Sequence, residues 1–382
     1  MAHGRPDGRR IRALLISHSY VSAELGQGKA RELARLPDVE VTVVQPDRFF
    51  ELNRWMAAER PAERGYGLVT LPVALPEVRG QRHAYFFRRG LAKVIRRVRP
   101  DVIDLWEEPY SVVSWQVLAL RRLLARRARL VLSVSQQAQK RYPPPFSLGE
   151  RAVLRGTAHL VGRSPEAVRV ARAKGYRGPA TLIGHGIDLR LFRPLPADES
   201  RARLGLEPGP TVGSLGRLVH DKAVDVLIDA VARLPGDVRL VVVGQGPERA
   251  DLERRAARAL GDRARFLDGM PIEEVPTLMS AVDVVAMPSR KEPWGRVAIE
   301  AMACGTPVVV GGGMLPALVD GHGWVVPPDD AGALAGALAE ALDRDAPGRA
   351  ERLEAAGAHA ATHSWAAVAE RWRDVYRQVL GL

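Results

Sequence analysis

The stretch "PTVGSLGRLVHDKAVDVLIDAVARLPGDVRLVVVGQGP", residues 210–247, decides the fold. It begins with a short β-branched run that ends in glycine, and continues through an apolar helical pattern at residues 223–234. A second β-branched run follows at residues 238–247. A strand, a helix and a strand in this order form a βαβ unit, whose two strands pair in parallel. The stretch therefore predicts a parallel sheet with helices on its faces.

The same alternation extends outward in both directions. Later strand-like and helix-like runs lie at residues 250–260, 264–270, 282–289, 306–312 and 323–330. Earlier strand-like runs lie at residues 12–20, 39–47, 101–106 and 129–135, with helical patterns at 28–36 and 88–98. The alternation pauses at residues 184–200, which are rich in proline, glycine and charge.

We therefore predict an α/β protein of two doubly wound, Rossmann-like domains in series, with a deep cleft between them. The first domain is expected over residues 1–190, completed by a C-terminal helix over about 364–382. A linker at 191–204 and a second domain at 205–363 complete the prediction.

The composition is that of an ordinary globular protein: 382 residues, 46% of them hydrophobic and 26% charged. A single cysteine excludes an intrachain disulfide framework and fits a reducing compartment. No apolar run approaches the roughly 20 residues of a membrane span. The basic N-terminus does not have the pattern of a signal peptide. We expect a cytoplasmic protein, peripheral at most to the inner face of a membrane.

The net charge of +12 is distributed unevenly. Residues 1–197 carry 35 Lys and Arg against 17 Asp and Glu, whereas the remaining residues carry 21 against 27. This asymmetry indicates an anionic partner for the first half, either an acidic molecule or a membrane surface. Arginines scattered over solvated faces would give the same composition, so this alternative stays open.

Glycine-bearing loops follow the strands predicted for the second half. They lie at residues 216–222, 244–249, 288–295 and 311–314, and the first three also carry charged residues. Glycine allows backbone N–H groups to approach an anion closely, and ligands of such sheets bind beyond the carboxyl ends of the strands. Arg217 follows its strand, and Lys222 is expected to begin the next helix. Two cations at one strand end suit a diphosphate.

Two glutamates stand in "KEPWGRVAIEAMA", residues 291–303. Glu300 is expected in the helix after Gly295, where its carboxylate can accept the two hydroxyls of a vicinal diol such as a ribose. Glu292, in the preceding turn, can reach other hydroxyls. The alternative is that Glu300 is a solvated helix residue and Glu292 a capping carboxylate. The apolar neighbours of Glu300 favour function, since a charge on an apolar helix needs a partner.

These residues resemble a known family. The segments that carry the resemblance are "GSLGRLVHDKAVDVLIDA", "LVVVGQGPERADL", "RFLDGM", "VVAMPSRKEPWGRVAIEAMACGTPVVV" and "DGHGWVVPPDD". They are similar to the nucleotide-sugar domain of retaining glycosyltransferases of the GT-B fold, family four. The first half is similar more weakly, through "RPDVIDLWEEPYS", "QQAQKRYPPPF" and "LIGHGIDLRLFRP".

The resemblance implies a role for each matching residue. Arg217 and Lys222 match the basic pair that holds the donor diphosphate, Glu292 the glutamate that contacts the transferred sugar, and Glu300 the glutamate that binds the ribose. The other positions that match the donor site are Gly216, Gly244, Gly246, Trp294, Gly295 and Arg296. Trp365 matches the aromatic residue that starts the C-terminal helix, which crosses back to the first domain.

The sequence also departs from the family pattern. Ala223 and Ala317 replace a glycine and a glutamate that are usual there, and "ELGQGKARELARL" replaces the usual Gly-Gly loop of the first domain. Trp106, Glu107 and Glu108 stand where the family often has a histidine. His185 replaces a linker asparagine, and Tyr142 lies in the rigid "RYPPPF".

The acceptor side therefore has four candidates, each with a structural alternative. Glu107 and Glu108 either face the cleft or form an acidic surface turn. His185 either lines the cleft or is a structural linker residue. Tyr142 either contacts the acceptor or belongs to a loop that only turns the chain.

The resemblance implies transfer of a hexose-type sugar from a nucleotide diphosphate to an acceptor hydroxyl, with retention. We expect front-face attack in which the leaving diphosphate acts as the base. No metal and no cofactor is expected, and the "DRD" at residues 343–345 lies far from any predicted strand end. The acceptor is a glycan, a lipid-linked molecule or a secondary metabolite.

Three other classes of function fit parts of the sequence. An NAD-dependent oxidoreductase lacks support because Arg249 interrupts the G-x-G-x-x-G pattern. A nucleotide-sugar 2-epimerase on the same fold stays open. A membrane-surface or nucleic-acid binder would use the basic, amphipathic stretch at 88–98, which otherwise packs on a sheet. We expect no nucleic-acid partner.

Overall fold

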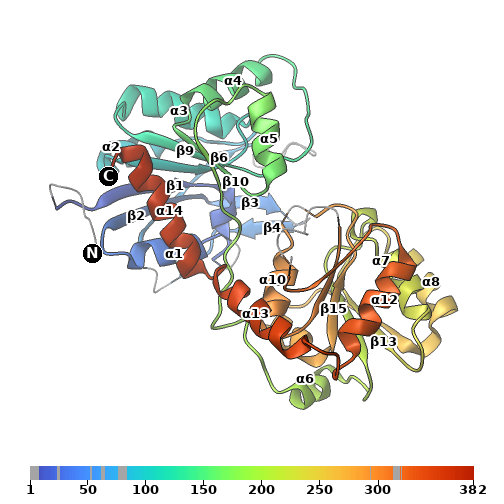
Figure 1. Ribbon diagram of the computed structural model, residues 1–382. Coiled ribbons are helices and arrows are strands. Elements are labelled where there is room, and N and C mark those ends of the chain that lie inside the picture. Colours follow the sequence, from blue (N-terminus) through green and yellow to red (C-terminus); the bar gives the residue numbers. More distant parts are fainter. Residues whose placement is uncertain are drawn as a thin grey trace. The chain divides into compact units, whose positions relative to one another are not determined.

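The structure is a computed structural model (Figure 1). It describes residues 8–23, 26–51, 54–61, 65–75, 84–292, 294–312, 319 and 321–382. Pro293, Ala317 and residues 313–314 of the predicted loop at 311–314 lie outside the described residues, as do Glu24 and Leu25 of the first glycine loop.

Strands and helices alternate along the chain, as the β-branched and amphipathic runs predict. The strands are β1 (Ile11–Ile16), β2 (Val39–Pro46), β3 (Arg48–Glu51), β4 (Arg54–Ala57), β5 (Gly67–Leu71), β6 (Val73–Ala74), β7 (Phe86–Phe87), β8 (Val102–Trp106), β9 (Arg129–Val134), β10 (His159–Gly162), β11 (Ala180–Leu182), β12 (Thr211–Leu215), β13 (Arg239–Val243), β14 (Ala264–Leu267), β15 (Val284–Met287), β16 (Val308–Gly311) and β17 (Trp324–Val326).

The helices connect these strands. The α-helices are α1 (Gly28–Arg35), α2 (Leu91–Val98), α3 (Val112–Leu124), α4 (Phe146–Gly156), α5 (Pro165–Ala173), α6 (Ala197–Leu204), α7 (Val224–Ala232), α8 (Arg249–Ala259), α9 (Val275–Ala281), α10 (Arg296–Ala303), α12 (Ala331–Leu342), α13 (Arg349–Ala361) and α14 (Trp365–Leu380). Short 3-10 helices are η1 (His18–Val21), η2 (His220–Lys222), η3 (Gly261–Arg263) and η4 (Ile272–Glu274).

The chain divides into two units. Unit 1 contains residues 1–186 and 365–382, and unit 2 contains residues 187–364. The segment predicted as a linker, 191–204, includes α6, which belongs to unit 2 and packs on α9.

The two crossings between the units are paired. On the unit 2 side, Ile187 and Ser364 form a parallel bridge, and the Ile187 N–H donates to the His363 carbonyl at 2.9 Å. On the unit 1 side, a Cβ on Gly186 would lie 2.4 Å from the Trp365 ring, so only glycine fits there.

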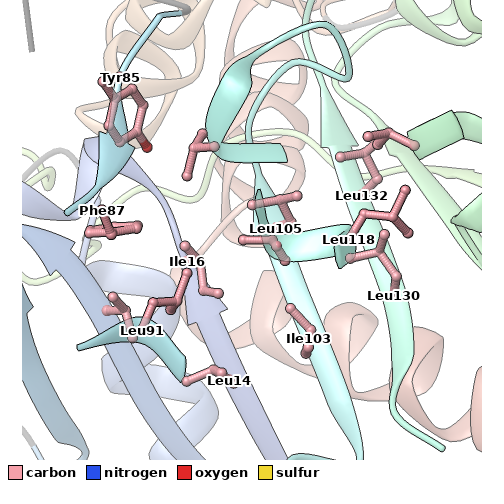
Figure 2. Close-up of a cluster of buried hydrophobic side chains, with 14 of the residues drawn as sticks. Leu14, Ile16, Tyr85, Phe87, Leu91, Ile103, Leu105, Leu118, Leu130 and Leu132 are labelled. Atoms are coloured by element: carbon pink, nitrogen blue, oxygen red, sulfur yellow. The ribbon is translucent and has the colours of Figure 1, made fainter. Parts of the chain in front are cut away.

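The main sheet of unit 1 has the strand order β11-β10-β9-β8-β1-β2-β5 in its described residues, and all pairs are parallel. Because successive side chains of a strand point to opposite faces, Leu14 and Ile16 pack on one face and Ala13 and Leu15 on the other. Helices α2, α3, α4 and α5 cover the first face, whose core Figure 2 shows. Helices α1 and α14 cover the second face and lie side by side (Figure 1).

The described part of unit 2 repeats this plan around a sheet of order β14-β13-β12-β15-β16-β17, again parallel. Helices α7, α8 and α12 pack on one face, and α9, α10 and α13 on the other. Parallel strands end at one edge of the sheet, so the loops after β12, β13 and β15 lie together there. This edge holds the residues predicted to bind the donor.

The basic, amphipathic stretch of residues 88–98 contains α2. Its apolar residues Leu91, Val94 and Ile95 are buried in the core of unit 1, so this face is not exposed for a membrane. None of the described helices combines the length and apolar character that a membrane-crossing segment needs.

Candidate functional site

The loops after β12 and β13 are joined backbone to backbone. The Leu218 N–H donates to the Gln245 carbonyl at 2.9 Å. A Cβ on Gly244 would lie 1.8 Å from the Gly216 carbonyl oxygen, and a Cβ on Gly246 would lie 2.1 Å from the Leu218 carbonyl oxygen. Only glycine fits at either position. These glycines therefore have a structural role, whatever they do toward a ligand.

Lys222 ends the short helix η2 and does not begin the following α-helix. Ala223 separates the two elements with φ of +52°, and α7 begins at Val224. The prediction that Lys222 begins this helix is wrong because the left-handed backbone at Ala223 interrupts the helical pattern. Glycine takes this conformation without the roughly 1–2 kcal/mol that a Cβ costs, which explains the preference for glycine here.

Arg217 lies two residues after the end of β12, and it is exposed. Within the described part of the chain, its guanidinium forms no ion pair or hydrogen bond. A guanidinium presents a planar fork of N–H donors that matches a phosphate. Arg217 is thus available to an anion at the edge of the sheet where the resemblance puts the donor diphosphate.

Glu292 is 8% exposed, and its carboxylate contacts both the residue before α10 and the end of η2. Its Oε1 accepts a hydrogen bond from the Gly295 N–H at 3.3 Å, immediately before α10. This contact precedes the helix and is not a side-chain cap of it, because Gly295 is itself the N-cap residue of α10. Glu292 Oε2 forms an ion pair with Lys222 Nζ. The residues predicted to bind the sugar and the diphosphate are therefore paired with each other, and an anionic ligand would compete for Lys222.

Glu300 lies in α10 with its side chain 2% exposed, so the alternative of a solvated helix residue is wrong. Arg296, one turn earlier, provides the partner that a buried carboxylate needs, with Nε 2.9 Å from Glu300 Oε1. Arg296 was predicted only as a position of the donor site, and the contact of its side chain with Glu300 was missed. The i, i+4 spacing of the two residues was the signal available in the sequence.

A small cavity of about 10 Å³ lies behind the site, between the ends of β12 and β15. Arg217, Lys222, Ser214 and Ser289 are among the residues that line it. The Ser289 hydroxyl is buried and has no hydrogen-bond partner among the described residues. A cavity of this size has room for about one water molecule.

In unit 1, Glu107 is 5% exposed and is not part of an acidic surface turn. Its Oε1 accepts the His18 N–H at 2.8 Å and the Tyr85 hydroxyl at 2.5 Å, and it lies 2.7 Å from His18 Nδ1. Burial raises the pKa of the Tyr85 hydroxyl, and the Glu107 carboxylate adds to the shift. The carboxylate thus joins segments that are far apart in the sequence, and sequence reasoning missed His18 and Tyr85 for that reason.

Glu108 is also drawn inward rather than set on the surface. Its Oε1 accepts the Ser135 N–H at 2.9 Å and the Ser135 hydroxyl at 3.0 Å. Its Oε2 is buried without a partner among the described residues, and burial raises the pKa of this carboxyl. The alternative of an acidic surface turn is therefore wrong for both glutamates, and the alternative that they face the cleft stays a prediction.

Tyr142 and His185 pack against aromatic rings of unit 1. The Tyr142 ring stacks on Tyr110 at 4.2 Å between centroids. His185 lies edge-on to Trp106 at 5.3 Å and to Trp365 at 6.3 Å. These contacts fix both side chains, and they leave the proposed acceptor roles as predictions.

A buried polar cluster in unit 1 was also missed. Lys29 Nζ lies 2.8 Å from Asp104 Oδ2 and 3.8 Å from the centroid of the Trp372 ring, and the Tyr376 hydroxyl donates to the same carboxylate oxygen. Burial lowers the pKa of Lys29, and Asp104 opposes that shift. The signal was Asp104 itself, a carboxylate inside an apolar strand, which requires a partner.

The comparisons with known proteins agree with this architecture. Residues 196–360, nearly all of unit 2, match the family model described as glycosyl transferases group 1. Over these residues the chain is similar to the group 1 glycosyl transferases, and we call residues 196–360 the group 1 domain. Arg217, Lys222, Glu292 and Glu300 all lie in it.

Curated relatives align over part of their length. The chain is 37% identical over 251 residues to a D-inositol 3-phosphate glycosyltransferase of Mycolicibacterium paratuberculosis, covering 62% of this chain and 56% of that protein. A Mycobacterium avium protein of the same name is 36% identical, with 62% and 59% covered. The chain thus spans somewhat more than half the length of these relatives.

Solved structures match over both the group 1 domain and unit 1. Sucrose-phosphate synthase of Thermosynechococcus elongatus is 25% identical with a TM-score of 0.70, covering 98% of this chain and 100% of that one. HepE of Anabaena in complex with UDP is 21% identical with a TM-score of 0.72, covering 97% and 100%. The chain has the GT-B fold, as predicted.

Proposed function

We propose that this chain is a retaining glycosyltransferase that transfers a hexose-type sugar from a nucleotide diphosphate to an acceptor hydroxyl. The observation that carries the proposal is the exposed Arg217 guanidinium beside Lys222, at the end of the central strand β12 of a group 1 domain. HepE, which shares the fold, has been solved with UDP and with UDP-glucose. A donor of this chemical class supplies the diphosphate that the two cations fit.

Each site residue has a role in this proposal. Arg217 and Lys222 stabilise the charge that develops on the leaving diphosphate, where fixed cations are most effective. The buried Glu300 carboxylate accepts the hydroxyls of the ribose, and Glu292 accepts hydroxyls of the transferred sugar. Because Lys222 and Glu292 are paired, donor binding exchanges one ion pair for a phosphate contact and a sugar contact.

The chemistry we propose is family-four front-face transfer without a metal. The acceptor oxygen attacks the anomeric carbon from the side of the departing diphosphate, the C–O bond to the diphosphate breaks, and a diphosphate oxygen takes the acceptor proton. The protein holds the two reactants in contact and stabilises the leaving group. None of these steps requires Glu292 or Glu300 to act as an acid or base.

The acceptor is expected to be anionic or to lie at an anionic surface. The curated relatives are named for inositol 3-phosphate, a phosphorylated polyol, and we propose this class of acceptor together with lipid-linked ones. In unit 1 a groove lies at the amino ends of the strands, and its lining includes Arg12, Arg96, Arg99, Arg126 and Arg127, with Asp101 paired to Arg12. Such a surface attracts an anionic membrane or draws an anionic acceptor toward the protein, whereas the acceptor site itself is expected at the carboxyl ends of the strands. Sedimentation with anionic and neutral liposomes at physiological salt separates a membrane partner from a free acceptor.

The first test is a screen of nucleotide diphosphate sugars by thermal shift, followed by assays of sugar hydrolysis and of transfer to phosphorylated polyols. We expect Arg217→Ala to lower transfer at least about hundredfold without lowering the unfolding temperature. Glu300→Gln, which keeps the side-chain volume, is expected to lower donor affinity. Wild-type rates in both variants would show that the donor site lies elsewhere.

The alternative is a 2-epimerase that acts on the nucleotide sugar alone. Nuclear magnetic resonance can monitor whether the donor is converted to its 2-epimer with no acceptor present. Such conversion would contradict the transferase proposal and support the epimerase. A chain that binds none of the nucleotide sugars and still binds anionic vesicles would support the surface-binding alternative.

A further inference from the structure

One side chain that sequence reasoning did not single out joins three loops at the donor edge of unit 2. Arg290 is 15% exposed and lies in the loop after β15. Its Nη1 donates to the His220 carbonyl at 2.6 Å, in the loop after β12. Its Nη1 and Nη2 donate to the Asp225 carboxylate at 3.1 and 2.8 Å, at the start of α7. Its Nε donates to Asp329 Oδ1 at 2.6 Å, in the loop after β17.

The backbone around Arg290 makes the same connection. The Arg290 and Lys291 N–H groups donate to the Asp221 carbonyl at 2.9 and 3.4 Å. Asp221 precedes Lys222, and Glu292 follows Lys291. The turn that carries Lys222 and the segment that carries Glu292 are therefore held together by backbone bonds and by the Arg290 guanidinium.

The Nε, Nη1 and Nη2 atoms of the Arg290 guanidinium all donate hydrogen bonds to protein acceptors. Asp225 and Asp329 balance its charge, and the hydrogen bond to Asp225 is the main cause of its raised pKa. Burial would raise the pKa of Asp225, but the hydrogen bonds and charge of Arg290 bring it below the ordinary value. Arg290 thus has no reason to bind a phosphate itself, unlike Arg217.

We propose that Arg290 is a positioning residue of the donor site, which sets the separation of Lys222 and Glu292; this rests on the proposed function. Lysine at this position would keep the charge, but a single ammonium cannot reproduce a planar fork that reaches two other loops and the start of α7. The geometry of the Lys222–Glu292 pair would then relax, and both residues would meet the donor less well.

The test compares Arg290→Lys with Arg201→Lys. Arg201 is also 15% exposed and donates to the Asp283 carboxylate at 2.6 Å and to the Gly209 carbonyl at 3.0 Å. These contacts lie at the opposite ends of β12 and β15, so the two variants lose similar interactions within one sheet.

Binding of UDP, GDP, ADP and dTDP is measured by calorimetry. For each nucleotide that the wild-type protein binds, we expect Arg290→Lys to lower the affinity about tenfold. This is the contribution of about one hydrogen bond to a charged group. Arg201→Lys is expected to leave affinity unchanged. Equal losses in both variants, or none in Arg290→Lys, would overturn the proposal.

A second arm asks whether Arg290 acts through Lys222. In a Lys222→Met background, Arg290→Lys is expected to cause no further loss of nucleotide affinity, since the cation it positions is gone. In an Arg217→Lys background the loss should persist. Equal further losses in both backgrounds would contradict the positioning role.

A third arm needs no ligand. Glu292 Oε1 accepts the Gly295 N–H at 3.3 Å, so a displaced Glu292 exposes that amide. We expect Arg290→Lys to speed hydrogen exchange at Gly295 in the free protein, with Arg201→Lys unchanged; unchanged exchange in Arg290→Lys would refute the proposal. If wild type binds no nucleotide, the proposed function fails while this arm still tests the positioning.

Discussion

Single residues decide how closely the loops at the donor edge approach one another. Gly244 has φ of +149° and lies against the Gly216 carbonyl, so two independent constraints require glycine at that position. Gly336 is the opposite case, because it lies inside α12 with no atom within 4 Å of the position its Cβ would take.

We expect Gly244→Ala to separate the loops after β12 and β13, because its Cβ would overlap the Gly216 carbonyl oxygen. Nucleotide binding should be lost and the unfolding temperature lowered. Gly336→Ala should instead stabilise the protein by about 0.5–1 kcal/mol, the usual gain in a helix interior. Calorimetry and thermal unfolding measure both effects. If Gly244→Ala still bound nucleotide, the close approach of the loops after β12 and β13 would not be required for binding, and the prediction would be wrong.

A buried histidine gives the protein a defined response to acid. His159 begins β10, is 1% exposed, and has Nε2 2.9 Å from the Thr181 hydroxyl. Burial lowers the pKa of this imidazole below its ordinary value of 6.5. The unfolded chain therefore takes up a proton more readily than the folded chain, and stability is present above about pH 6.5 and lost as the pH falls.

Below about pH 6.5, His159 should cost the wild-type protein up to about 1.4 kcal/mol of unfolding free energy per pH unit. His159→Gln removes this titration, so the difference in stability between the two proteins should shift in favour of the variant on acidification. Urea unfolding at several pH values gives the comparison. A difference that is constant with pH would show that His159 does not titrate in this range.

At the scale of elements, helix α14 is attached to unit 1 through buried polar contacts. Tyr376 donates to the Asp104 carboxylate, which also binds Lys29, and the Trp372 ring covers the Lys29 ammonium. Tyr176 provides a neutral comparison, because its buried hydroxyl donates to the Pro179 carbonyl at 2.6 Å.

Tyr376→Phe should cost about 1.5–3 kcal/mol, since it removes a hydrogen bond to a buried charge. Tyr176→Phe should cost about 1 kcal/mol, because its acceptor is neutral. Urea unfolding, monitored in unit 1 through hydrogen exchange of the β8 amides, measures the loss of stability in each variant. A smaller loss in Tyr376→Phe than in Tyr176→Phe would mean that Lys29 alone satisfies Asp104.

The elements were predictable from the sequence to different degrees. Apolar runs placed β12, β13 and β15 because a fully buried parallel strand is apolar on both faces. The boundary at Lys222 was missed because a left-handed Ala223 carries no sequence signal. Long-range contacts were missed for a related reason: His18 and Glu107 are separated by 89 residues, and nothing in either neighbourhood specifies the other.

The sequence singled out the candidate donor residues but not the residues that support them. Arg217 and Lys222 follow β12, and Glu292 and Glu300 follow β15 in the loop and the helix after it, on the side of the sheet where the fold concentrates ligand contacts. Arg290, by contrast, has the sequence context of an ordinary charged loop residue, and its partners come from two other loops and from the start of α7. The roles of the four predicted residues remain predictions until the donor is identified.

At the scale of the whole molecule, the proposal requires the protein cations to replace a metal. We expect transfer to persist after EDTA treatment and to show no gain when Mg²⁺ or Mn²⁺ is added, because Arg217 and Lys222 neutralise the leaving diphosphate. The assay of transfer with and without chelator measures this. Loss of activity in EDTA, restored by a divalent cation, would require a metal in the mechanism.

The paired crossings have a consequence for how this protein can be dissected. Unit 2 is one unbroken segment whose ends, Ile187 and Ser364, are bridged, and Gly186 lies against Trp365 in unit 1. The group 1 domain is thus an insertion, and a gene fragment that encodes residues 187–364 has adjacent termini. We therefore expect that it can be expressed alone or circularly permuted, and that a short link can rejoin the two flanking segments of unit 1 where the insertion is excised.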